Sequence, residues 1–146
     1  GLLTPQPQDF ELILNWLKYL QEEKLDYTLS FRNLGNLLDK NNLPSNFEPS
    51  SNFKDFESLW RQRLQAQFFD HGQAAVKNMM DQVNPIYIPR NHQVERAIEG
   101  ALSGDLAIFK EMLQVLKNPF REQAGFEIYK NPPRPEEEVL ETFCGT

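Results

Sequence analysis

The chain has 146 residues and a net charge of −6, with 40 % hydrophobic and 25 % charged residues. These values suit one globular core and exclude a disordered chain. The acidic balance argues against a nucleic-acid surface, because phosphate backbones are bound by clustered Lys and Arg. No apolar run reaches the roughly 18 residues that a membrane span needs, so we also expect no membrane partner.

The sequence starts at Gly1 without an initiator Met, a basic region or a long apolar region. We therefore expect no signal peptide, and we expect the natural protein to begin well upstream. Cys144 is the one cysteine in the chain, so no disulfide can form within it. A reducing compartment is the default expectation for such a chain.

Two helices are predicted before a polar loop. The first runs from Asp9 to about Glu23, with Asp9 as its cap. Its apolar face repeats at i, i+3, i+4 and i+7 and comprises Ile13, Trp16, Leu17 and Leu20. Thr28 or Ser30 is placed to cap the second helix, whose apolar residues are Phe31, Leu34, Leu37 and Leu38. Residues 39–52 are rich in Asn, Ser and Pro, which predicts a surface loop within one domain.

Two further helices follow this loop. The third has Asn52 as a candidate cap, and its apolar face comprises Phe53, Phe56, Trp60 and Leu64. Arg61 and Arg63 are expected to point away from that face. The aromatic residues, which continue to Phe69, are interpreted as core packing, with a recognition stripe as the alternative. The fourth helix should end near Asn84, because a residue before proline avoids the helical region; its apolar residues are Val76, Met79, Met80 and Val83.

Residues 84–120 predict an extended segment followed by a helical hairpin. Ile86–Pro89 has proline on both sides and so cannot join the middle of a sheet. The fifth helix, capped by Asn91, carries Val94, Ala97, Ile98 and Ala101. Gly104 suits a left-handed C-terminal position, and Asp105 directly caps the sixth helix. That helix is expected to bury Leu106, Phe109, Leu113 and Leu116.

Beyond Pro119 the helical pattern decays. Residues 131–135 read NPPRP and are expected to be non-helical, so 119–146 is predicted to be an extended tail. No stretch shows the repeated alternation of a sheet. The predicted fold class is all-α: an irregular bundle of about six helices with an extended Pro-rich tail, forming a single α-helical domain over 1–146.

Few residues in the chain suggest chemistry. His71 and His92 have no second histidine nearby in sequence, so we interpret each as a structural or surface residue and expect no metal site. No nucleophile elbow surrounds a serine, and the glycines do not form a phosphate loop. Arg90 and Asn91 lie at the predicted start of the fifth helix, and the start of a helix can bind an anion. We favour a structural role instead, in which Arg90 pairs with a carboxylate. Cys144 has two interpretations. A thiol near the terminus is accessible, which favours a redox role, whereas neighbouring negative charge disfavours the reactive thiolate, which favours an inert residue.

Several segments in order resemble a known family. Residues 84–120 read NP-x-Y-I-x-RNH-x-V-x-x-AI-x-x-A-x-x-GD-x-x-x-F-x-x-x-L-x-x-L-x-NPF. Agreeing with them are Asp26-Tyr27-Thr28, Phe31-Arg32-x-Leu34, Trp60-x-x-Arg63-Leu64 and a cysteine close to the C-terminus. Together they resemble the selenoprotein O family, the pseudokinase-fold protein adenylyltransferases, which in bacteria are the YdiU-like proteins. The motif residues singled out are Asn84, Pro85, Tyr87, Arg90, Asn91, Gly104 and Asp105.

The resemblance implies that the chain is roughly the C-terminal third of such a protein, a helical domain that packs on an upstream kinase-like core. Family members transfer AMP from ATP to hydroxyl side chains of protein substrates, with Mg²⁺ or Mn²⁺. Their nucleotide-binding and metal-binding residues belong to the core, so no catalytic, cofactor-binding or metal-binding residue is implied in this fragment. Only Cys144 matches a functional position, the tail cysteine that in some relatives is selenocysteine or forms a regulatory disulfide. Here Cys144-Gly145-Thr146 departs from the family's usual Cys-Ser-Ser.

Three interpretations of function follow. The first is a non-catalytic C-terminal domain of a protein adenylyltransferase, cytoplasmic in a bacterial-type member and mitochondrial in a eukaryotic one. The second is a free-standing α-helical protein-interaction module, because the sequence pattern of the predicted hairpin is also typical of helix pairs in solenoid proteins. Against it, no second copy occurs at a period of 34 or 40 residues. The third is a redox role centred on Cys144.

Overall fold

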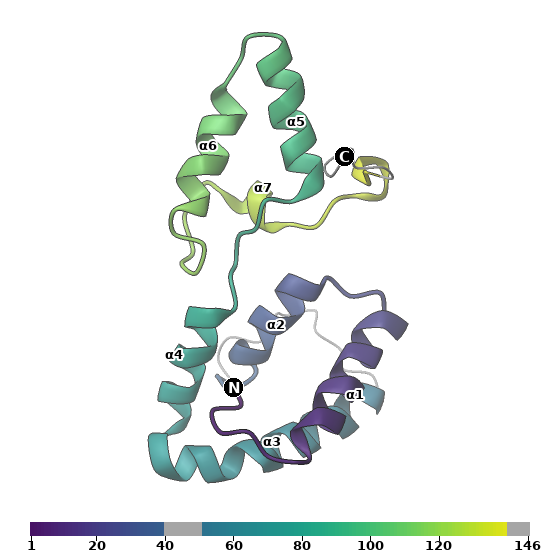
Figure 1. Ribbon diagram of the computed structural model, residues 1–146, viewed down its shortest axis with the longest axis vertical. Coiled ribbons are helices and arrows are strands. Elements are labelled where there is room, and N and C mark those ends of the chain that lie inside the picture. Colours follow the sequence, from purple (N-terminus) through teal and green to yellow (C-terminus); the bar gives the residue numbers. More distant parts are fainter. Residues whose placement is uncertain (40–50, 140–146) are drawn as a thin grey trace. The chain divides into compact units, whose positions relative to one another are not determined.

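The computed structural model describes residues 1–39 and 51–139, and it confirms the all-α class, since the described residues form helices and no strand (Figure 1). The chain divides into two compact units, Gly1–Asn84 and Pro85–Thr146. A single domain over 1–146 stays a prediction. Residues 40–50 of the predicted loop, and Cys144 in the tail, lie outside the described residues.

The described part of the first unit consists of α1 (Asp9–Glu22), α2 (Tyr27–Asn36), α3 (Ser51–His71) and α4 (Gln73–Val83). In this unit α1 packs on α3, α2 on α4, and α3 on α4 (Figure 1). The order confirms the first four predicted helices. α4 ends at Val83, and Asn84 is extended, with φ −102° and ψ 104°, as the proline after it predicts.

Aromatic rings dominate the core of the first unit. Trp16 of α1 stacks on Phe56 of α3 with ring centroids 4.8 Å apart, which confirms core packing for the start of the aromatic run. The end of the run differs, because the Phe69 side chain is 92 % exposed. The buried residues of this core are Leu12, Trp16, Tyr19, Leu20, Leu34, Leu37, Leu38, Phe53, Phe56, Trp60, Leu64, Val76 and Met80.

The predicted caps in the first unit are wrong. α2 is capped by Asp26 and not by Thr28 or Ser30, since the Asp26 carboxylate accepts a hydrogen bond from the Leu29 amide at 2.8 Å. Asp26 has an extended backbone immediately before the first helical residue, which is the geometry a cap requires. Asn52 lies inside α3 and therefore does not cap it.

The described part of the second unit consists of α5 (Asn91–Leu102), α6 (Ala107–Leu116), the short α7 (Glu127–Lys130) and a 3₁₀ turn, η1 (Pro135–Glu137). α5 and α6 form the predicted hairpin (Figure 1). The core of this unit consists of Ile86, Tyr87, Ala97, Met112, Val115 and Tyr129. The extended segment before α5 thus supplies two of its core side chains.

The structure differs from the prediction along α6 and in the tail. Leu106, Phe109 and Leu113 are 44 %, 47 % and 48 % exposed, because the adjacent stripe of α6, with Met112 and Val115, faces the core. The tail is not uniformly extended, since it forms α7 and η1. Burial of Tyr129 holds α7 on the hairpin, and Pro135 stands at the first position of η1, where its fixed φ suits a helical turn.

Candidate functional site

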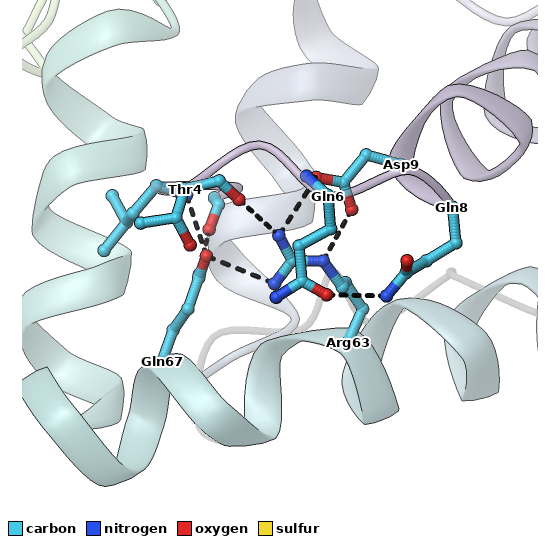
Figure 2. Close-up of polar contacts among 8 residues, drawn as sticks. Thr4, Gln6, Gln8, Asp9, Arg63 and Gln67 are labelled. Atoms are coloured by element: carbon cyan, nitrogen blue, oxygen red, sulfur yellow. Dashed lines mark hydrogen bonds and ion pairs between the residues drawn. The ribbon is translucent and has the colours of Figure 1, made fainter.

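Within the described part of the first unit, the Arg63 guanidinium of α3 lies at the centre of a cluster of polar contacts (Figure 2). Its Nε and Nη2 donate to the two carboxylate oxygens of Asp9, at 2.5 and 3.0 Å. Nη2 also donates to the Thr4 carbonyl oxygen at 2.6 Å. The Arg63 and Asp9 side chains are 6 % and 10 % exposed. The bidentate pair therefore fixes the segment before α1 onto α3.

Gln67, one helical turn beyond Arg63, extends the same anchor. Its Oε1 accepts from the Leu3 amide at 2.8 Å, and its Nε2 donates to the Gly1 carbonyl oxygen at 2.5 Å. It is 5 % exposed. The N-terminal segment thus runs beside α3 with its backbone polar groups held by two side chains, as buried backbone groups require. We call Arg63, Gln67 and Asp9 the N-terminal anchor.

The N-terminal anchor corrects two sequence expectations. Arg63 does not point away from the apolar face, and Asp9 does not cap α1, because its carboxylate accepts from Arg63 and from the Gln6 amide instead. The spacing carried a signal for this. Phe56, Trp60, Arg63 and Gln67 repeat at i, i+4, i+7 and i+11, which places all four side chains on one helix face.

The electrostatics of the N-terminal anchor follow from its geometry. The hydrogen bond from Arg63 lowers the pKa of the Asp9 carboxyl below its ordinary value, against the raising effect of burial. The hydrogen bond from the Gln6 amide lowers it further. Asp9 is therefore held as a carboxylate matched to the guanidinium, and the pair has a structural role in positioning backbone.

Arg32, from the FR-x-L motif, binds the end of α4. Its Nη1 donates to the carbonyl oxygens of Asp81 at 2.7 Å and Asn84 at 3.1 Å. A cation at a helix C-terminus complements the carbonyl groups that lack helical partners there. The motif residue Asn84 thus contributes its backbone to the end of α4, and Pro85 follows it half-buried.

Tyr87 holds the extended segment of the second unit to the segment that follows α6. It is 1 % exposed, and its hydroxyl donates to the Gln123 carbonyl oxygen at 3.3 Å and accepts from the Gln123 amide at 3.1 Å. The Gln123 side chain in turn donates to the Val115 carbonyl oxygen at 2.9 Å. The amides of Ile86 and Tyr87 both donate to the Pro119 carbonyl oxygen, at 2.7 and 3.2 Å. Two proline-bordered segments of the motif are therefore joined directly.

Arg90 and Asn91 occupy the start of α5 but play different parts. Arg90 is 6 % exposed, and its Nε donates to the Lys130 carbonyl oxygen at 3.0 Å, at the end of α7. Asn91 is exposed and does not cap α5, whose cap position is Arg90. His92 is 6 % exposed, its Nδ1 has no hydrogen-bond partner among the described residues, and burial lowers its pKa. His71 lies on the surface.

Gly104 and Asp105 form the turn of the hairpin. Gly104 adopts φ +86°, as predicted, and its amide donates to the Ala101 carbonyl oxygen at 3.0 Å. The Asp105 amide donates to the Gly100 carbonyl oxygen at 2.8 Å, which completes a Schellman motif. The Asp105 carboxylate accepts a hydrogen bond at 2.8 Å from the amide of Ala107, the first residue of α6. The cap position of α6 is nevertheless Leu106, one residue later than predicted. A Cβ at Gly100 would lie 2.9 Å from the Asp105 carbonyl oxygen, so only glycine fits this close approach.

The polar groups described above hold backbone segments in place. Among residues 1–39 and 51–139, no three His, Cys, Asp or Glu side chains converge as metal ligands. None of the helices in this part of the chain is both long enough and apolar enough to cross a bilayer.

Comparison with known protein families identifies the family of this chain. A family model described as "Protein adenylyltransferase SelO" matches residues 1–117. The chain therefore belongs to the SelO family. The N-terminal anchor and the turn of the α5–α6 hairpin lie within the matched range.

Individual relatives are named as nucleotidyltransferases. The chain is similar to the "Protein nucleotidyltransferase YdiU" of Rhodopseudomonas palustris, with 42 % identity over 151 residues in strain HaA2 and 44 % over 151 residues in strain BisB5. A protein of the same name from Rhizobium rhizogenes strain K84 is 40 % identical over 153 residues. In each case all of this chain is covered, and it spans 30 % of the relative's length.

Proposed function

We propose that this chain is the non-catalytic C-terminal helical region of a pseudokinase-fold protein adenylyltransferase. In this proposal the longer protein transfers AMP from ATP to hydroxyl side chains of protein substrates, with Mg²⁺ or Mn²⁺. Parts of the polypeptide outside 1–146 bind the nucleotide and the metal. The observation that carries the proposal is the match of the whole chain to 30 % of the length of nucleotidyltransferase relatives.

The polar groups of the chain support a scaffold role. Arg63 is engaged with the Asp9 carboxylate and the Thr4 carbonyl, and Tyr87 with the backbone of Gln123. Groups engaged in this way hold segments in place and are not free to hold a phosphate. The bacterial origin of the relatives supports a cytoplasmic member of the family, and protein substrates are expected to bind the longer protein.

The test compares two proteins under the same conditions: the chain 1–146 and the full-length natural protein that contains it. Each is incubated with radiolabelled ATP and either Mg²⁺ or Mn²⁺, and transfer of AMP to protein is measured. We expect labelling by the full-length protein, and neither labelling nor nucleotide binding by 1–146. Nucleotide binding by 1–146 would contradict the non-catalytic assignment, and absence of labelling by the full-length protein would favour the interaction-module alternative.

The redox interpretation of Cys144 has a separate test. In the full-length protein, a Cys144→Ser variant is compared with the parent after oxidation and after reduction. A regulatory disulfide predicts that oxidation changes the transfer rate of the parent and leaves the variant unchanged. Equal responses of the two proteins would remove a regulatory role for this thiol.

A further inference from the structure

α1 has apolar side chains on two faces. Its inner face, with Leu12, Trp16, Tyr19 and Leu20, is buried in the core of the first unit. On its outer face Phe10, Ile13, Leu14 and Leu17 repeat at i, i+3, i+4 and i+7 and are 68 %, 44 %, 47 % and 36 % exposed. A surface helix of a globular protein normally carries polar residues opposite its core face. We call these four residues the outer stripe.

The outer stripe continues into an apolar cavity. Ile13 lines a cavity of about 190 Å³ together with Trp16, Phe31 and Met80, all within the first unit. An apolar cavity of roughly 150 Å³ is large enough for a benzene ring. A neighbouring segment can therefore lay an apolar surface along α1 and insert one side chain beside Ile13, the arrangement typical of well-packed interfaces.

We propose that the outer stripe is the surface against which the rest of the full-length polypeptide packs. The chain spans 30 % of the relatives' length, so more than two thirds of each relative lies outside it and is available to cover the stripe. α1 itself lies inside the range that matches the family model. The inference deepens the proposed function and rests on it, because that function makes 1–146 part of a longer protein. The occupant is apolar, and it belongs to the same polypeptide.

Photo-crosslinking in the full-length protein identifies the occupant. Benzoylphenylalanine is placed at Leu14 in the stripe and, as a matched control, at exposed Asn15 on the other side of α1. After irradiation we expect position 14 to link to a peptide of the same polypeptide outside 1–146, with the product migrating as a monomer. Position 15 is expected to give no such link. A link between two copies, links confined to 1–146, or no link from position 14 would each overturn the proposal.

A charge substitution gives a second, independent measurement. Leu14→Asp should leave the thermal midpoint of the chain 1–146 nearly unchanged, because the side chain is already 47 % exposed there. In the full-length protein the same change should lower the midpoint by at least about 4 °C, whereas Asn15→Asp should lower neither. Equal effects of Leu14→Asp in the two proteins would refute docking at this face. Neither readout depends on AMP transfer, so failure of this inference is distinct from failure of the proposed function.

Discussion

Substitution of Arg63 by Met tests the N-terminal anchor most directly. Met keeps much of the side-chain volume but removes the guanidinium, which leaves the buried Asp9 carboxylate without its two charged hydrogen bonds and the Thr4 carbonyl without its donor. Breaking a buried ion pair by removing one partner costs about 3–5 kcal/mol. The matched control is Lys18→Met, whose pair with Glu22 is 3.7 Å long and 73 % and 49 % exposed. Such an exposed helical pair contributes at most about 0.5 kcal/mol.

The assay is urea unfolding of the chain followed by tryptophan fluorescence. Both tryptophans, Trp16 and Trp60, lie in the core of the first unit, so the signal reports on the unit that contains the anchor. With an m-value of about 2 kcal/mol/M, Arg63→Met should lower the midpoint by roughly 2 M, and Lys18→Met should leave it almost unchanged. Adding Asp9→Asn to Arg63→Met removes the unpaired buried charge and should recover about 1–3 kcal/mol.

The stability that the N-terminal anchor contributes should fall as the pH is lowered. The pKa of Asp9 is lower in the folded chain than in the unfolded one, so the pair stabilises the fold above about pH 4 and loses its contribution as pH falls through the folded value. The penalty of Arg63→Met should therefore shrink between pH 7 and pH 3. If Arg63→Met is no more destabilising than Lys18→Met at pH 7, the anchor does not stabilise the first unit as argued.

Two predictions concern the second unit. Gly100→Ala should destabilise this unit, because a clash at 2.9 Å with the Asp105 carbonyl oxygen costs about 1–3 kcal/mol and outweighs the gain in helix propensity of about 1 kcal/mol. We expect faster hydrogen exchange in α5 and α6 than in a Glu99→Ala control, and unchanged exchange would contradict the prediction. Burial and the hydrogen bond that its hydroxyl donates to Glu111 at 2.6 Å raise the pKa of Tyr129 to about 12. The stability from its neutral phenol is present below pH 10 and is lost as pH rises towards 12. In an alkaline absorbance titration, Tyr129→Phe should remove an ionising phase near pH 12, and an identical curve for the variant would show the assignment to be wrong.

Local patterns in the sequence were enough to predict the features that depend on nearby residues. Helical periodicity located the first six helices, Pro85 predicted the end of α4, and Gly104 predicted the left-handed turn, because each is set by backbone sterics or by spacing along one helix. The sequence motif of residues 84–120 also indicated the family to which the chain belongs. These inferences needed no knowledge of distant contacts.

Contacts between distant segments, in contrast, fix which polar and apolar groups meet across the chain. Arg63 pairs with Asp9, 54 residues away, and although its spacing places it on the buried face of α3, no local pattern could identify that partner. Arg61, two residues earlier, pairs instead with Glu57 of the same helix. The sequence could not predict that Phe109 is exposed either, because α6 has two adjacent apolar stripes. In the folded unit the stripe with Met112 faces the core. Periodicity shows that a helix has an apolar face, but the partners available in space determine which face is buried and which charged groups can be buried with it.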